Sequence, residues 1–181
     1  MSYPSTEKKI PPGKRIGQGM LIFSFVLGLG GLTFFFDDQI QQLANPNQNP
    51  RSMELNSGVR EVVLQQNRQG HYVASGTVNN VSVLFLLDTG ATDVAIPDSI
   101  ALAAGLQRSN TSRASTANGV VTVYSTRVAE LTLGNIVLED VNASITTSMA
   151  GDTILLGMSA LRQVEFSQRG DELTLRHYPE S

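Results

Sequence analysis

The chain has no cysteine and no tryptophan, and the first of these absences excludes several kinds of chemistry. Without cysteine there is no disulfide, no thiol nucleophile and no thiolate metal site. The two histidines, His71 and His177, are far apart and lack the spacing of metal ligands, so ordinary surface or strand-edge positions are favoured for both. We therefore expect no metal and no cofactor.

Positive charge is also scarce and is not gathered in a stripe. The chain has 13 Lys and Arg against 16 Asp and Glu, which gives a formal net charge of −3. Nucleic-acid binding requires clustered basic residues, so we expect no nucleic-acid partner. The chain does have 181 residues, 41% of them hydrophobic, which is enough for one compact domain with additional segments.

A charge-free apolar run occupies residues 16–36, after a polar segment, 1–15, with four basic residues. The run has about the 20 residues that are needed to cross a hydrocarbon core of about 30 Å. The apolar region of a cleavable signal peptide has only about 7–15 residues, so we favour an uncleaved anchor over a signal sequence. The basic residues precede the run and Asp37 and Asp38 follow it, which predicts a cytoplasmic N-terminus and an exported, periplasmic domain.

The composition changes twice after the apolar run. Residues 37–58 are rich in Gln, Asn and Pro and poor in core-forming residues, which predicts a flexible linker. From residue 59 onward, short apolar runs alternate with turn residues, as is typical of an all-β domain. We therefore predict a cytoplasmic segment at 1–15, a membrane anchor at 16–36, the linker and a folded domain at 59–181.

Within that domain the pattern predicts a series of short strands. Asn79-Asn80 and Asn118-Gly119 are tight-turn signals that predict β-hairpins, although Asn-Gly turns also occur without any functional role. Short helices are expected at 98–104 and around 159–161. The expected strands are 61–66, 71–78, 81–87, 93–96, 112–117, 120–133, 136–145, 153–157, 164–166 and 172–178.

The strand over 81–87 is apolar almost throughout, which predicts burial on both faces, and it continues directly into Asp88-Thr89-Gly90. A carboxylate at the end of a buried strand is costly unless it is hydrogen-bonded or shares a proton. Asp88 is therefore the candidate catalytic residue; the alternative is a turn residue that caps Gly90. A second apolar strand meets a glycine at Ile154-Leu155-Leu156-Gly157.

Three features in this order resemble one lobe of the retropepsin-like aspartic proteases, and in particular their membrane-anchored bacterial group. They are Leu86-Leu87-Asp88-Thr89-Gly90-Ala91, the hairpin tip at Asn118-Gly119, and Ile154-Leu155-Leu156-Gly157-Met158. The resemblance covers about residues 60 to 178. It implies a closed β-barrel, the acid protease lobe, with one short helix or two. It also implies an aspartic endopeptidase that acts on peptides or proteins.

The resemblance assigns roles to the catalytic loop and to the strand beneath it. Thr89 would hydrogen-bond to its symmetry mate, and Gly90 would let backbone and substrate approach the carboxylate closely. Leu156 and Gly157 would pack beneath the loop, and plain packing is the leading interpretation of Gly157 even within the family.

The resemblance also identifies residues that would contact substrate. Ala91 and Thr92 would do so from the catalytic loop, where Thr92 stands in the place of an acid usual in the retroviral enzymes. Ala117-Asn118-Gly119 would form the tip of a flap that pairs with an extended substrate and excludes water.

The chemistry of such an enzyme needs two carboxyl groups. One activates a water molecule while the other donates a proton, because two carboxyls held about 3 Å apart share one proton. The chain has one Asp-Thr-Gly, so we predict a homodimer in which Asp88 and its mate meet on a two-fold axis. The alternative function is a membrane-tethered, non-catalytic module of the same fold that binds a peptide or a partner subunit.

Overall fold

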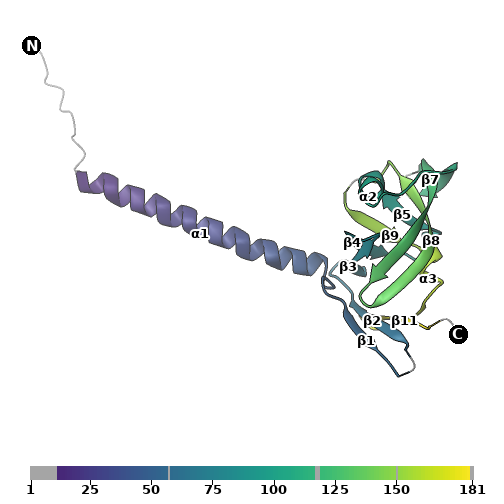
Figure 1. Cartoon of the computed structure of the whole chain (residues 1–181). Helices are drawn as coiled ribbons and strands as arrows, with labels where there is room; N and C mark the ends of the chain where they lie inside the picture. The colour runs from purple at the N-terminus through teal and green to yellow at the C-terminus, as the bar shows by residue number, and fades with distance from the viewer. Residues whose placement is uncertain (1–11, 57, 117–118, 150, 180–181) are drawn as a thin grey trace, which may run out of the picture. The chain divides into compact units, whose positions relative to one another are not determined.

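The computed structural model describes residues 12–56, 58–116, 119–149 and 151–179. The chain divides into two units, residues 1–41 and 42–181. Figure 1 shows the long helix α1 (Pro12–Ala44) and the strand-rich second unit. The fold is mostly β, with α1 and two short helices, as the sequence predicts.

Helix α1 carries the apolar run of the sequence. Its large side chains between residues 16 and 36 are exposed all round the helix. The segment Ile16–Ala44 is long and apolar enough to cross a bilayer. The chain therefore has one long apolar helix near its N-terminus, of the kind that serves as a membrane anchor or as a signal sequence.

Strands and two short helices make up the second unit. The helices are α2 (Asp98–Ala103) and α3 (Met158–Leu161). The strands are β1 (Arg51–Glu54), β2 (Arg60–Gln65), β3 (Val73–Val78), β4 (Val81–Leu87), β5 (Val94–Pro97), β6 (Thr111–Thr116), β7 (Gly119–Leu133), β8 (Ile136–Thr146), β9 (Thr153–Leu156), β10 (Glu165–Arg169) and β11 (Glu172–His177).

Seven of these strands form a sheet that closes on itself. Their order is β3-β4-β9-β5-β8-β7-β6, and β3 also pairs with β7 through Thr77 and Val78, which completes a barrel. Asn79 and Asn80 both have positive φ, so the β3–β4 turn is of the predicted tight type. The sequence expectation of a closed β-barrel is confirmed.

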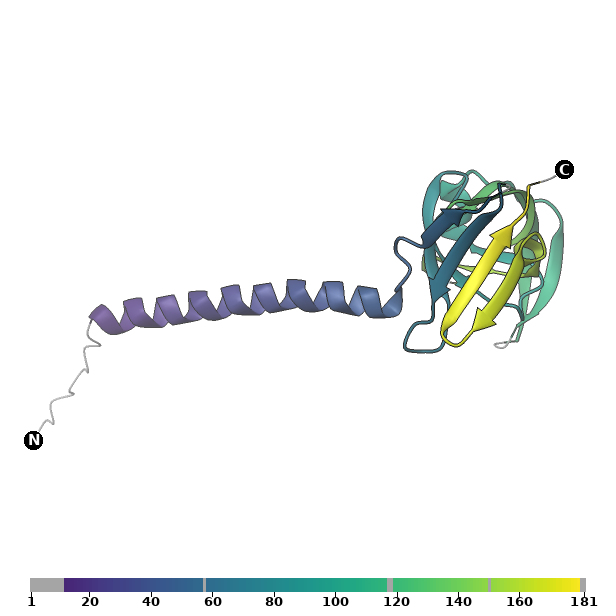
Figure 2. The same cartoon turned by 90° about the horizontal axis from the view of Figure 1, so that it is seen from below.

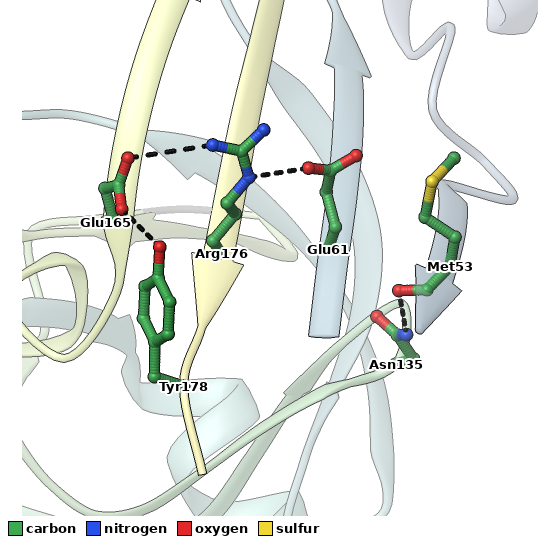
Figure 3. A network of polar contacts seen from close by, with 6 residues as sticks. All are labelled: Met53, Glu61, Asn135, Glu165, Arg176 and Tyr178. Carbon is green, nitrogen blue, oxygen red and sulfur yellow. Dashed lines mark hydrogen bonds and ion pairs between the residues drawn. The ribbon is translucent and has the colours of Figure 1, made fainter. Parts of the chain in front are cut away.

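A smaller sheet with the order β1-β2-β11-β10 lies beside the barrel. Figure 2 shows its C-terminal hairpin, β10 and β11 in yellow, next to the blue strand β2. Polar contacts cross this sheet, because Arg176 on β11 donates to Glu61 on β2 at 2.6 Å and lies 3.8 Å from Glu165 on β10 (Figure 3). The pKa of Arg176 is raised chiefly by its hydrogen bond to Glu61.

One continuous core joins the two sheets. It includes side chains from both, such as Phe85 of β4 and Leu175 of β11. The largest fully buried side chains are Phe85, Leu64, Ile96, Leu131, Ile136, Ile145, Ile154 and Leu175. The prediction for β4 needs a correction, because Val83 and Phe85 are buried whereas Leu84 and Leu86 are only half-buried. One face of β4 therefore packs in the core and the other is less covered.

The structure also corrects the expected flexible linker over 37–58. Helix α1 continues to Ala44, and Arg51–Glu54 forms β1, which pairs with β2. Between them Asn47 is buried and its side-chain amide is hydrogen-bonded to the backbone of Gln65 and Val73. Amide side chains can replace a missing strand partner in this way, so a Gln- and Asn-rich composition did not mean disorder here.

Candidate active site

The Asp88 loop follows β4 and is held by short backbone contacts. The Asp88 N–H donates to the Leu156 carbonyl at 3.2 Å, which prolongs the parallel pairing of β4 with β9. The Asp88 carboxylate accepts the Gly90 N–H at 2.9 Å, and its carbonyl accepts the Ala91 N–H at 3.2 Å. The carboxylate is thus oriented by its own loop, the arrangement of an Asx turn.

Gly157 lies directly against this loop from the other side. A Cβ at Gly157 would come within 2.3 Å of the Asp93 carbonyl oxygen and 2.8 Å of the Ala91 carbonyl oxygen, so no larger residue fits. Immediately after Gly157, the N–H of Met158 donates to the Ala91 carbonyl at 2.8 Å. Leu156, which precedes it, is almost fully buried. The contacts between these two segments fix the position of the loop.

Ser159 is a further residue that holds the loop, and no motif in the sequence identifies it. Its N–H donates to the Thr92 carbonyl at 2.9 Å, and its hydroxyl accepts the Val94 N–H at 2.9 Å. The same hydroxyl donates to the Asn142 carbonyl at 2.7 Å. Ser159 therefore connects the end of the loop to β5 and β8.

A pocket of about 300 Å³ opens beside Asp88. Asp88 itself is half-buried and Thr89 is exposed, so within one chain the carboxylate is in contact with solvent. The pocket brings together residues from the barrel, from α3 and from the smaller sheet. Its lining is Tyr72, Leu87, Asp88, Thr89, Leu161, Phe166, Gln168 and Leu173.

Tyr72 forms the buried part of this pocket wall. It is 9% exposed, and its hydroxyl has no hydrogen-bond partner among the residues that the structure describes. Burial raises the pKa of Tyr72, and the negative charge of Asp171 adds to this effect. The phenol is therefore neutral over the whole physiological pH range.

Known proteins are similar to this domain in sequence and in fold. A family model described as gag-polyprotein putative aspartyl protease matches residues 74–163, which contain both the Asp88 loop and Gly157. The crystal structure of a retropepsin-like aspartic protease from Rickettsia conorii superposes with a TM-score of 0.54 and 25% sequence identity, covering 71% of this chain and 94% of that one. This domain belongs to the retropepsin-like aspartyl protease family.

Two uncharacterized bacterial proteins are also similar in sequence to this retropepsin-like chain. One, encoded in the 5′ region of cobV in a Sinorhizobium species, is 35% identical over 123 residues, which cover 66% of this chain and 53% of that protein. The other, from Rickettsia prowazekii, is 28% identical over 133 residues, which cover 70% of this chain and 55% of that protein. The chain spans about half the length of the curated relatives that it matches.

The flap expected of a retropepsin-like domain falls on the β6–β7 hairpin. Ala117 and Asn118 lie outside the described residues, and Gly119 is the exposed first residue of β7. The described residues of this hairpin do not line the pocket beside Asp88. In the loop, Ala91 is half-buried and Thr92 is exposed. Substrate binding by these residues stays a prediction.

Sequence reasoning missed the residues that complete the pocket. Tyr72 and Phe166 lie in segments that the local pattern identifies only as strands, and Gln168 lies in the turn expected between 164–166 and 172–178. Tyr72 lies beside the loop through the β3–β4 hairpin, because the Leu87 N–H donates to the Tyr72 carbonyl at 3.0 Å. Phe166 and Gln168 reach it through the smaller sheet, where β10 pairs with β11 and β11 with β2, and that long-range pairing has no local sequence signal. The turn signal Gln168-Arg169-Gly170-Asp171 predicts the closing hairpin but not the elements that lie beside that hairpin.

Proposed function

We propose that the protein is an aspartic endopeptidase whose active site is completed by a second copy of the chain. The observation that carries this proposal is the Asp88 carboxylate on a loop fixed by β9 and Gly157, at the wall of a pocket. Asp88 is the one acidic residue in that pocket lining. A water molecule between two such carboxyls would be activated by the ionised one, while the protonated one supplies the proton for the leaving amine.

The roles of the neighbouring residues follow from this proposal. Thr89 is exposed beside Asp88 and is available to hydrogen-bond to its mate. Gly90 keeps the space beside the carboxylate clear, because a Cβ there would crowd the Asp88 carboxylate oxygen at 3.1 Å. Leu156 and Gly157 support the loop. Ala91, Thr92 and the flap tip at 117–119 would contact an extended peptide by strand addition.

We further propose that residues 16–36 anchor the enzyme in a membrane, with residues 1–15 in the cytoplasm and the protease domain on the far side. The support is the length and uncharged composition of the run and the basic residues before it. A tethered protease meets substrates close to that membrane.

The test is cleavage of a diverse peptide library by the full-length chain in detergent micelles. We expect cleavage by the wild type to fall at least about 10³-fold in Asp88→Asn, because the dyad loses the carboxylate that activates water. Asp93→Asn is the matched control, since Asp93 is an exposed acid at the end of the same loop. A transition-state mimic of peptide hydrolysis should inhibit the wild type.

Equal cleavage by wild type and Asp88→Asn would exclude the proposed chemistry. Peptide binding without cleavage by either protein would instead support the non-catalytic module.

A further inference from the structure

Residues 44–50, which connect helix α1 to strand β1, are bonded to the domain from the first residue onward, and we call them the strap. The carbonyl of Ala44, the last residue of α1, accepts the Asn67 side-chain amide at 3.1 Å. Asn45 is 6% exposed, and its amide donates to the Ser75 hydroxyl at 3.0 Å. Its side-chain oxygen accepts the Asn47 N–H at 2.9 Å, which fixes the turn between the two residues. The folded domain therefore begins where the helix ends.

Asn47 fastens the strap to the edge of β3 that β4 does not occupy. It forms a parallel bridge with Ala74, and its carbonyl accepts the Ser75 N–H at 3.0 Å. Its side-chain amide is bonded to the backbone of Gln65 and Val73. Releasing the strap would leave these buried backbone groups without partners, which is costly. The strap therefore remains on the domain in the folded state.

The strap also lies close to the candidate catalytic loop. β3 pairs with β4, with Ala74 opposite Phe85, and Asp88 is the third residue after Phe85. Two strand spacings of about 4.8 Å and three residue rises of about 3.3 Å place Asp88 about 14 Å from Asn47. The point at which the chain enters the domain is thus near the candidate active site.

Few residues separate the strap from the apolar run, which ends at Phe36. The chain from Phe36 to Ala44 spans about 12 Å as a helix and about 27 Å when it is fully extended. Together with the chain from Ala44 to Asn47, this limits Asp88 to about 50 Å from Phe36 even at full extension. A flexible linker over 37–58 would by itself reach about 75 Å, so the strap shortens the range of the active site.

We propose that the strap holds the active site within about 50 Å of the membrane surface, and that the substrates are extended segments of membrane-anchored proteins inside this layer. Anchoring enzyme and substrate in one membrane raises their effective concentration, provided that the tethers let them meet. A cleavage site beyond the reach of the strap has an effective concentration near zero. The inference rests on the proposed function, because it names the substrates of that same active site.

The test uses the full-length chain in lipid vesicles with substrates of defined height. Each substrate is an apolar membrane span continued by helical Glu-Ala-Ala-Ala-Lys repeats into the library peptide that the wild type cleaves best. Repeats of 10 and 50 residues place the cleavage site about 15 Å and about 75 Å from the span. We expect the wild type to cleave the near site at least about tenfold faster than the far site.

Lengthening the chain before the strap tests the cause of this preference. A 40-residue Gly/Ser insert between Gln39 and Ile40 adds a root-mean-square reach of about 35 Å and should reduce the preference to about threefold or less. The same insert after Ser5, before the apolar run, is the matched control and should leave the preference unchanged. A preference that the insert at Gln39 does not alter would overturn the inference.

A second measurement does not depend on cleavage. The chain has no cysteine, so Thr92→Cys gives one labelling site, exposed at the end of the Asp88 loop. Energy transfer from a fluorophore there to an acceptor on the lipid headgroups should fall at least about twofold when the insert at Gln39 is added. Unchanged transfer would contradict the role of the strap, because the longer chain would not have moved the loop.

The outcomes also separate this inference from the proposed function. If free peptides are cleaved in an Asp88-dependent way but near and far sites are cleaved equally, the protease stands and the restriction by the strap is wrong. If no peptide is cleaved but energy transfer falls with the insert, the strap does hold the loop near the membrane and the protease is wrong.

Discussion

Tyr72 places a phenol ring in the wall of the Asp88 pocket, and its hydroxyl is buried without a partner among the described residues. A buried hydroxyl with no hydrogen bond is a cost to the folded state, on the order of 1–3 kcal/mol. A residue of this kind in a pocket is well suited to meet a polar group of a ligand or of a second copy. The hairpin predicted at Asn79-Asn80 places Tyr72 near Leu87, but the sequence carries no sign that the Tyr72 hydroxyl is buried without a partner.

The raised pKa of Tyr72 predicts a loss of stability at alkaline pH. The unfolded phenol releases its proton near pH 10.0, whereas the folded one keeps it to higher pH because burial disfavours the phenolate. Above pH 10.0 the unfolded state therefore binds fewer protons than the folded state, and the free energy of unfolding falls as the pH rises. Below pH 10.0 the contribution of Tyr72 is fully present and constant.

Tyr72→Phe should reduce this alkaline slope and change stability at neutral pH by no more than about 1 kcal/mol, in either direction. The measurement is the denaturant midpoint between pH 8 and 11, with tyrosinate absorbance as a direct readout in a chain that has four tyrosines and no tryptophan. Tyr178 serves as the comparison for Tyr72, because its pKa is also raised, chiefly by its hydrogen bond to Glu165 rather than by burial. An unchanged slope in Tyr72→Phe would count against the assignment to Tyr72.

At the scale of the element, local pattern was enough to locate nearly every strand of the second unit. Turn residues such as Asn79, Asn80 and Gly170 mark chain reversals, and all three have the positive φ that few other residues adopt. The apolar run of β4 ends at Asp88, as the sequence indicates. Turns and strand ends are determined by residues that are adjacent in the sequence, so the local pattern is enough to predict them.

Pairing between distant elements could not be predicted in the same way. β4 pairs in parallel with β9, and β5 pairs in parallel with β8, across separations that carry no local signal. The support of the Asp88 loop was predicted only because the resemblance to a family supplied the position of Gly157. The Asn and Gln residues before β1 predict a flexible linker, because amide side chains favour solvent. They favour order only where a strand edge is available to them, and the sequence does not show that edge.

Asn47 tests this corrected view of the segment. Its side chain makes three hydrogen bonds of 2.7–2.9 Å to the backbone of Gln65 and Val73, and it is 3% exposed. Asn47→Ala leaves those backbone groups without their partner and should lower the free energy of unfolding by about 2–4 kcal/mol. Asn49→Ala should change it by less than about 0.5 kcal/mol, because Asn49 is exposed.

Chemical denaturation of both variants measures the difference, and hydrogen exchange at residues 45–54 reports it locally. Equal stability of Asn47→Ala and Asn49→Ala would contradict the corrected view and support the flexible linker that the sequence predicts.

At the scale of the whole molecule, the described part of one chain supplies one carboxylate, that of Asp88, to the lining of the pocket beside the loop. A dyad made by two copies implies that an inactive copy disables the active copy with which it pairs, because a lone carboxyl cannot serve as both base and acid. An active site that is complete within one chain is not affected by an inactive copy. The two cases therefore differ in how peptide cleavage depends on the ratio of wild type to inactive variant in a mixture.

Subunit mixing therefore decides between them. Wild type exchanged with a ninefold excess of Asp88→Asn should keep only about a tenth of its peptide cleavage, because random pairing leaves about one wild-type copy in ten with a wild-type partner. The same excess of Asp93→Asn should leave the cleavage per wild-type copy unchanged or higher. Cleavage that stays proportional to the wild-type copies at every ratio would mean that each chain contains a complete site.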